Sequence, residues 1–506
     1  MKSATAVGLL LLAAATGVSD SASQARSSGR CLARAFGAKG DGFTLDTEAI
    51  QRAIDEVNCD EVVLDAVGDN STFLVGTIHL KSHLSFVVEE GVTLLGANDT
   101  VYDLPEANPF DQYQDFGHSH WHNSMICGDG CVNISVSGGG LLDGGGGLGN
   151  GGDMPNGYGD KMLALKSCHD VTLRDLHLQR TGHFALLATN VTSLDMRDLD
   201  ISPTRDGIDL VSCSDVFATH LSISGGGDDA FVLKSDYSLG AIIPSKNITL
   251  MNSSSSTNGA TALEIGSETV GDFSGIKFIN IDIHSAGNGA LGMAIMDGAH
   301  VSDVEYRNIT ISGSASPLQF YIGARQTGHP EGTGRKVGAI RDILVHHIRA
   351  HNMSDPYHPG PPRNWTAMLD GMPANNVTEA SAIGPNISVQ NVVWRFNGGG
   401  TFEGGNRDIE PPHPPLGWSC TGPWPSYGLF VREASDVTFT NVTFCFDEDD
   451  SRPAIALENA PHVTLDNVLA FRGDDGPDFD VLVRNGCDNL NIVGGNITAN
   501  ESSVAV

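Results

Sequence analysis

His169-Asp170-Val171-Thr172-Leu173 and Asn247-Ile248-Thr249-Leu250 are two copies of a short motif that recurs along the chain and indicates its fold: a turn residue, Val or Ile, Thr and another apolar residue. The first apolar position returns from Val171 to Leu490 after 20, 25, 32, 28, 28, 39, 44, 50, 26 and 27 residues. β-Branched residues favour strands, and Asn, Asp and Gly favour turns. The shorter intervals therefore indicate one coil of a solenoid, and the longer ones indicate loops inserted on particular coils.

This pattern predicts an all-β chain folded as a single-stranded right-handed parallel β-helix. The 61 glycines among 506 residues suit its tight corners. A β-propeller, with blades of about 40 to 45 residues, and a β-sandwich are the other all-β architectures. Intervals of 20 to 28 residues disfavour both.

One segment near the start has helical periodicity. Asp46 stands in front of residues 47–57 as a candidate N-cap, and Ile50, Ala53, Ile54 and Val57 share one face. Because a solenoid must cover its first coil, we expect this helix to cap the N-terminal end. We expect a single catalytic β-helix domain over residues 26–506, with long loops around 351–385 and 398–426.

The N-terminus resembles a secretory signal. Lys2 precedes an apolar run that ends at Val18, and small and polar residues follow. This order predicts a signal peptide over residues 1–25 and a secreted, extracellular protein. Asn-X-Ser/Thr sequons such as Asn98 and Asn352 then suggest a glycoprotein. Sequons inside the repeat, such as Asn247, are explained equally well by turn and strand preference.

The nine cysteines favour disulfides in an oxidising compartment. Cys31 with Cys59, Cys127 with Cys131, and Cys420 with Cys445 are candidate pairs, although sequence does not fix the connectivity. Their irregular spacing argues against a zinc ribbon.

The formal net charge of −32 bears on possible partners. Nucleic acids and anionic membranes require cationic patches, so we expect neither to bind. A polyanionic substrate would require a locally basic cleft, an acidic working pH or partial neutralisation of the substrate. We expect a monomer.

Two acid pairs stand about one coil apart. Asp206-Gly207-Ile208-Asp209 is followed, 22 residues after Asp206, by Asp228-Asp229 behind three glycines. Residues one coil apart stack about 4.8 Å from each other, so these acids would share one patch. Crowded carboxyl groups cannot all ionise, so one can act as an acid while another activates water or attacks carbon. The alternative is that these acids are solvated residues of turns with no catalytic role.

Other side chains add weaker signals. His183, about one coil before Asp206, could bind a sugar hydroxyl or serve structure alone. Glu264 could bind hydroxyls, add a fourth acid or simply lie at the surface. His118, His120 and His122 alternate as neighbours in a strand would and could bind a metal, but a sugar-stacking or loop role is favoured. We therefore expect no metal and no cofactor.

Several segments together resemble glycoside hydrolase family 28, the polygalacturonase family. The likeness covers most of the mature chain and includes segments 36–42, 138–144, 262–268 and 427–432. Asp206 matches the aspartate of the family's Asn-Thr-Asp-Gly motif, and Asp228 with Asp229 match its Gly-Asp-Asp motif. The resemblance implies that Asp228 is the general acid and that Asp206 and Asp229 activate water in an inverting hydrolysis of pectic poly- or oligosaccharide.

The chain departs from the family where specificity is read. Thr204-Arg205 replaces Asn-Thr, Ala260-Thr261-Ala262 replaces Gly-His-Gly, and Ala294-Ile295-Met296 replaces the Arg-Ile-Lys that clamps a galacturonate carboxylate. Losing two cations weakens carboxylate recognition. Either Lys234, Arg205 or Arg325 substitutes for them, or the sugar is neutral or esterified.

Two further functions remain open at this stage. A pectate lyase would have a similar fold but would need calcium and a basic proton abstractor. A non-catalytic carbohydrate-binding β-helix would have lost its activity together with the missing cations.

Overall fold

The computed structural model describes residues 29–68, 71–113, 117–150, 157–325, 327–354, 366–374, 381–402 and 424–500. The predicted signal peptide lies outside these residues, as do parts of the predicted loops at 351–385 and 398–426. Among the described residues, no helix is long and apolar enough to cross a membrane.

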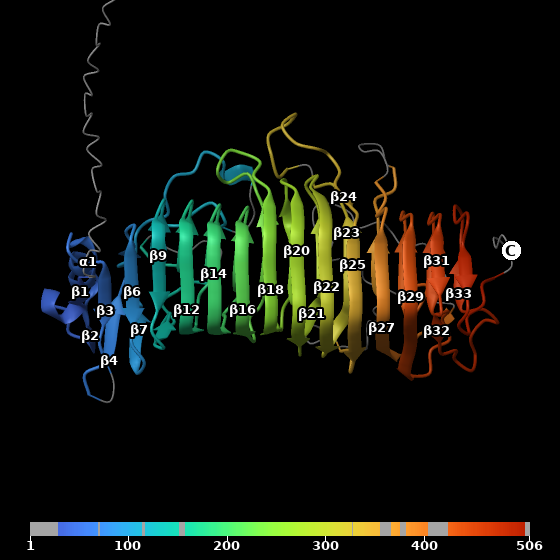
Figure 1. Cartoon of the computed structure of the whole chain (residues 1–506), viewed down its shortest axis with the longest axis horizontal. Coiled ribbons are helices and arrows are strands. Elements are labelled where there is room, and N and C mark those ends of the chain that lie inside the picture. The colour runs from blue at the N-terminus through green and yellow to red at the C-terminus, as the bar shows by residue number, and fades with distance from the viewer. Residues whose placement is uncertain are drawn as a thin grey trace, which may run out of the picture.

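Parallel strands wind along one axis, and successive coils stack side by side from the N-terminus to the C-terminus (Figure 1). The architecture is the predicted right-handed parallel β-helix. Its larger sheet, sheet A, has 21 described strands: β1 (Arg30–Leu32), β2 (Asp41–Leu45), β3 (Glu61–Leu64), β4 (Ser71–Val75), β6 (Leu84–Val88), β7 (Val92–Gly96), β9 (Val132–Ser137), β10 (Leu141–Asp143), β12 (His169–Gln179), β14 (Thr192–Ser202), β16 (Ser214–Ile223), β18 (Ser245–Ser255), β20 (Phe273–Ile283), β22 (His300–Ser312), β24 (Ala339–Ile340), β25 (Ile343–His351), β27 (Ile387–Gly398), β29 (Val437–Glu448), β31 (Val463–Asp466), β32 (Leu469–Ala470) and β34 (Asn491–Val493).

Sheet B forms the other wall of the coil. Its 13 described strands are β5 (Ile78–His79), β8 (Ser124–Asp129), β11 (Lys161–Lys166), β13 (Phe184–Thr189), β15 (Asp206–Val211), β17 (Phe231–Ser235), β19 (Leu263–Thr269), β21 (Ala286–Ile295), β23 (Ser314–Ile322), β26 (Ala367–Asp370), β28 (Leu429–Arg432), β30 (Ile455–Glu458) and β33 (Val481–Val483). The hydrophobic core lies between the sheets, where residues such as Ile208, Leu233 and Phe278 are fully buried.

The turn residue of the sequence motif has a specific backbone role. Asp170, Asn247, Asp303 and Asn386 all have φ between 54° and 64°, in the left-handed region. Asn and Asp tolerate this conformation better than other residues with a side chain. The motif therefore marks the corner at which each coil enters sheet A.

A second left-handed position bends the long strands of sheet A. In β20 and β22 it is occupied by Asn280 and Asn308, with φ of 57° and 54°. Their amides form a ladder between coils: Asn308 donates to Asn280 at 2.9 Å, and Asn280 donates to Asn252 at 2.8 Å. The ladder gives the side-chain amides at the bend hydrogen-bond partners within the protein.

The predicted N-terminal helix is α1 (Thr47–Asp55), and two 3₁₀ turns, η1 (Ala33–Phe36) and η2 (Asp111–Tyr113), accompany it in the chain. Ile50, Ala53 and Ile54 are fully buried, as predicted, but Val57 lies beyond the helix and is 80% exposed. The Asp46 carboxylate accepts bonds from the amides of Lys39 and Gly40 instead of capping the helix. The helix lies at the N-terminal end (Figure 1), and its capping function stays a prediction.

One predicted disulfide is present and one is excluded. Cys31 is bonded to Cys59. Cys127 and Cys131 are both free, because the Cys131 thiol lies in the core and donates to the Leu80 carbonyl, whereas Cys127 lies in β8 outside the core cluster. Cys445 is also free among the described residues, and its candidate partner Cys420 lies outside them.

Candidate active site

The predicted acids lie where the chain enters two neighbouring strands of sheet B. Asp206 is the first residue of β15, and Asp228 and Asp229 precede β17 in an irregular segment. Gly225 and Gly226 have φ of 93° and 84°, so only glycine fits this bend without strain. The bend frees Asp228 and Asp229 from the opposite orientations that consecutive residues have in a regular strand.

The surroundings of the three acids differ. Asp206 is 4% exposed, and burial together with Asp209 and Asp228 raises its pKa well above the ordinary value. Burial and the neighbouring Asp228 raise the pKa of Asp229 to about 8. The side chain of Asp228 is 22% exposed. Asp206 and Asp229 therefore hold their protons to higher pH than an ordinary aspartate, and the side chain of Asp228 reaches solvent.

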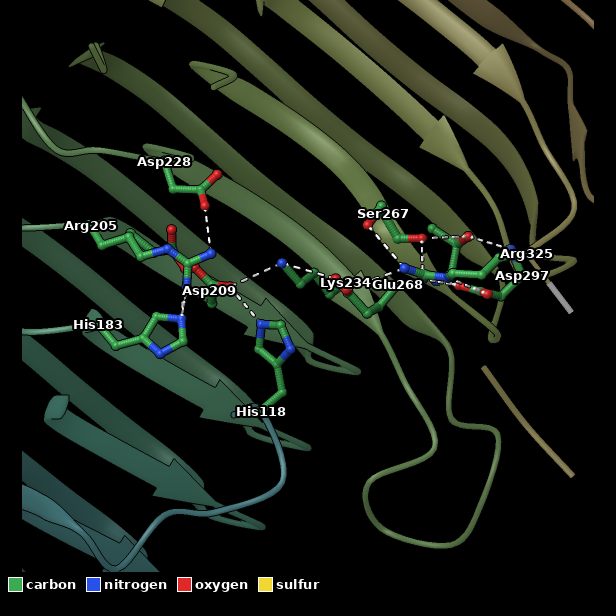
Figure 2. A network of polar contacts seen from close by, with 12 residues as sticks. His118, His183, Arg205, Asp209, Asp228, Lys234, Ser267, Glu268, Asp297 and Arg325 are labelled. Carbon is green, nitrogen blue, oxygen red and sulfur yellow. Dashed lines mark hydrogen bonds and ion pairs between the residues drawn. The ribbon is translucent and has the colours of Figure 1, made fainter. Parts of the chain in front are cut away.

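Arg205 connects Asp228 to His183. The guanidinium donates to Asp228 Oδ2 at 2.6 Å and contacts His183 Nε2 (Figure 2). Burial and the nearby Arg205 lower the pKa of His183, so its imidazole is neutral and its Nε2 accepts. The Asp206 carboxylate lies 3.7 Å from the same nitrogen, beyond hydrogen-bonding distance.

Lys234 is surrounded by acids on the outer face of sheet B. Its ammonium lies 2.9 Å from Glu268 and 3.5 Å from Asp209, and its side chain is 9% exposed. Despite burial, the acidic neighbours Glu268 and Asp209 raise the pKa of Lys234 well above the ordinary value. Asp209 in turn contacts His118 at 3.3 Å, which attaches the loop before β8 to the strands.

Arg325 continues this chain of charges toward the C-terminus (Figure 2). It forms a two-pronged ion pair with Asp297, donates to the Ser267 carbonyl at 3.0 Å and lies 3.6 Å from Glu268. Its side chain is 5% exposed. Lys234 and Arg325 are therefore both buried and both already paired with carboxylates.

Glu264 lies on β19 beside the acids, in register with Val232 of β17 and Gly292 of β21. A Cβ placed on Gly292 would lie 1.8 Å from Glu264 Oε2, so the glycine makes room for this carboxyl group. Burial and the nearby Asp229 raise the pKa of Glu264 well above its ordinary value. Glu264 is therefore a buried acid next to Asp229.

On the outer face of sheet B, the coils that follow Glu264 toward the C-terminus carry an apolar cluster. Ala294 and Met296, which stand where the family has Arg and Lys, pack in an outer cluster with Tyr321, Met368 and Phe430. No side chain at these two positions can pair with a carboxylate.

Sequence reasoning named Asp206, Asp228 and Asp229 but missed two acids of the network. Glu268 pairs with Lys234 and Asp297 pairs with Arg325, and neither acid carries a sequence pattern that distinguishes it from a surface residue. The three histidines that were weighed as metal ligands have separate acidic partners: His118 contacts Asp209, His120 lies 3.2 Å from Asp111, and His122 lies 3.5 Å from Asp129. Among the described residues, no group of three His, Cys, Asp or Glu side chains is placed to hold a metal.

Comparisons with known proteins bear on the family of the chain. The model of a family described as "Glycosyl hydrolases family 28" matches residues 59–356, more than half of the chain. A "Probable polygalacturonase" of Vitis vinifera is 24% identical over 367 residues, which span 68% of this chain and 71% of that protein. An "Exo-poly-alpha-D-galacturonosidase" of Dickeya chrysanthemi is 36% identical over 116 residues, 22% and 18% of the two chains.

A solved structure shows the same fold. The family 28 exopolygalacturonase of Yersinia enterocolitica superposes with a TM-score of 0.61 at 15% identity, over 87% of this chain and 79% of that one.

Proposed function

Because the chain belongs to glycosyl hydrolase family 28 and is a polygalacturonase-like glycosidase, we propose that it hydrolyses pectic polysaccharide of the polygalacturonan or rhamnogalacturonan type with Asp206, Asp228 and Asp229. The observation that carries the proposal is the placement of three aspartates on adjacent coils in unequal surroundings. Separate environments allow one carboxyl group to act as an acid and another as a base.

In the proposed mechanism, Asp228 protonates the leaving glycosidic oxygen, since its side chain is the most exposed of the three. Burial and neighbouring carboxylates raise the pKa of both Asp206 and Asp229, so whichever of the two is ionised is a strong base and takes a proton from water. The bond from the anomeric carbon to the leaving oxygen breaks as the bond to water oxygen forms. A single displacement of this kind inverts the anomeric configuration.

The predicted sugar-binding residues have unequal access to substrate. Arg205 has a partly exposed side chain, at 19%. His183, Lys234, Glu264 and Arg325 are each no more than 8% exposed as residues. Sugar contact by these four stays a prediction, and we infer that Lys234 and Arg325 contribute mainly by fixing the acids to which they pair.

Product analysis tests the proposal. The protein is incubated with de-esterified polygalacturonan and with rhamnogalacturonan, and the reducing ends, ultraviolet absorbance and anomeric configuration of the products are followed. We expect saturated products of inverted configuration, and near-total loss of cleavage in Asp228→Asn with binding retained. An unsaturated product that disappears with a chelator would identify a lyase instead.

We also propose that the protein is extracellular and monomeric. The signal-like N-terminus supports export, and the monomer is an expectation without structural support. Secretion from the native host and the mass measured by light scattering test this, and a cell-retained protein or a stable dimer would contradict it.

A further inference from the structure

Two free cysteines lie side by side in the core of the β-helix. Cys131 and Cys168 each stand directly before a strand of sheet A, β9 and β12, and both are buried, at 4% and 1% exposed. The two strands pair in register from Val132 with His169, and the His169 amide donates to the Cys131 carbonyl at 2.9 Å. The two cysteines therefore occupy the same position on neighbouring coils.

The two thiols also contact each other. A hydrogen bond between them lowers the pKa of Cys131 and raises that of Cys168. A Cβ placed on Gly128 of β8 would lie 3.5 Å from Cys168 Sγ, so the glycine leaves room for this sulfur. The other bonds of the thiols are to backbone carbonyls, such as that of Leu80 at 3.4 Å from Cys131 Sγ. Because a thiol is a weak donor, little stabilisation is lost when its hydrogen is removed.

The spacing of the coils suits a bond between these sulfurs. Neighbouring strands lie about 4.8 Å apart, within the range of roughly 4.4 to 6.8 Å between the Cα atoms of bonded cysteines. Cys213 belongs to the same column but lies two coils beyond Cys168, with the fully buried Val191 between them. That separation, about 9.6 Å or twice the strand spacing, is too long for a disulfide. The column thus holds one pair that can bond and one cysteine that cannot.

We propose that Cys131 and Cys168 are a disulfide site, which ties the coil of β9 to the coil of β12 when the chain folds in an oxidising compartment. The oxidant is the disulfide of a thiol–disulfide oxidoreductase or of oxidised glutathione. One cysteine thiolate attacks that disulfide and releases one oxidant thiol, and the second thiolate attacks the mixed disulfide and releases the other. The protein loses two protons and two electrons, and the oxidant gains them as two thiols. Because both sulfurs are buried in the folded protein, the exchange takes place before these coils close.

The bond would close a loop that contains β9, β10 and β11. A disulfide stabilises a fold mainly by restricting the unfolded chain, and a longer loop gives a larger effect. Strand β11 pairs with β13, which in turn pairs with the strand of Asp206. The bridge would therefore brace the coils on the N-terminal side of the acids. This inference concerns stability and does not depend on the proposed function.

Peptide mapping tests the bond directly. The full chain is exported into an oxidising compartment, purified without reductant, alkylated in denaturant and digested at Lys, Arg and Asp. Cleavage before Asp129 separates Cys127 from Cys131, so the bonded cysteine can be assigned. We expect a reducible pair of peptides that joins Cys131 to Cys168, and an alkylated Cys213. Alkylation of both Cys131 and Cys168, or a bond from either to another cysteine, would overturn the proposal.

Substitutions test the stabilisation. Cys131→Ala and Cys168→Ala remove the same bond, so each should lower the midpoint of thermal unfolding without reductant, and the double variant should lose less than the sum of both. Cys213→Ala is the matched control, because it removes a buried thiol of the same column that makes no such bond. Fully additive losses would contradict the bridge.

Reduction gives an independent measurement. Dithiothreitol should lower the midpoint of the unsubstituted protein more than that of Cys131→Ala, because the variant retains the Cys31–Cys59 bond but lacks this one. Cys213→Ala should show the same shift as the unsubstituted protein. Equal shifts in the unsubstituted protein and in Cys131→Ala would show that no bond joins Cys131 to Cys168.

Discussion

The outer faces of the two sheets differ although the same coils build both. In sheet A, strands such as β14 and β22 alternate between buried core residues and outward residues that reach solvent. In sheet B, every residue of β13, β15 and β17 is buried. The coil therefore exposes one wall to solvent and covers the other, and the acids are on the covered wall.

Polar side chains are satisfied differently on the two faces. In sheet A, uncharged amides bond along a ladder of like residues, as Asn308, Asn280 and Asn252 do. In sheet B, Asp209, Lys234, Glu268 and Arg325 alternate in charge with little solvent access. A ladder stabilises a repeat, whereas a buried charge network is sensitive to the loss of any member.

The largest expected difference between the faces is in catalysis. Asp229→Asn should lower kcat by roughly 10²- to 10⁴-fold, the usual contribution of an acid–base group. Asp282→Asn, on the exposed face of β20, should leave kcat unchanged. Initial rates on polygalacturonan measure both. Equal rates for the two variants would remove Asp229 from the mechanism.

Buried and exposed lysines provide the next contrast. Lys234→Met leaves Glu268 and Asp209 without their shared cation and should lower the free energy of unfolding by about 3–5 kcal/mol. Lys277→Met, at an exposed position of β20, should change it by less than about 0.5 kcal/mol. Urea unfolding followed by circular dichroism compares them. A Lys234→Met protein as stable as the control would contradict the inferred role of this cation.

The buried acids predict how stability depends on pH. Asp229 has a pKa of about 8 in the folded protein and about 4 when unfolded, so between these values the folded state holds a proton that the unfolded state has lost. Raising the pH through this window therefore destabilises the fold. Asp229→Asn should remove this contribution and be more stable than the parent at pH 7, by about 4 kcal/mol, with no gain at pH 4.

Unfolding midpoints of both proteins across this pH range measure the effect. Asp282→Asn, whose side chain is exposed, should follow the parent curve. A constant offset between Asp229→Asn and the parent at all pH values would show that the carboxyl group does not titrate in this window.

The smallest effect is expected in the ladder of sheet A. Asn280→Ala removes two hydrogen bonds and a residue that tolerates φ of 57°, which should cost about 1–2 kcal/mol of stability without changing kcat. Asn280→Gly keeps the backbone conformation accessible and isolates the hydrogen bonds. Thermal unfolding and initial rates test both variants, and a loss of activity in folded protein would show that the two faces are coupled.

Much of the fold was predictable because its determinants are local. The Val/Ile-Thr motif and its Asn or Asp corner predicted the coil, and the left-handed φ of residues such as Asp170 and Asn247 explains the corner. Helix α1 was predicted with an error at each end. Val57 continues the apolar spacing but lies beyond the helix, and the Asp46 carboxylate bonds to Lys39 and Gly40 instead of capping it. The predicted pairing of Cys127 with Cys131 was wrong, because the Cys131 side chain lies in the hydrophobic core and that of Cys127 lies outside it.

The repeat and the acids one coil apart could be read from the sequence, because spacing along the chain becomes stacking in a solenoid, and motif resemblance indicated the glycosidase family. The folded structure was needed to show that Lys234 and Arg325 are buried and paired with acids and that the side chain of Arg205 is partly exposed. His118 meets Asp209 across 91 residues, and Arg325 reaches Ser267 across 58. Charge pairing depends on burial and on distances of a few ångströms between distant segments, and neither follows from the order of residues in the chain.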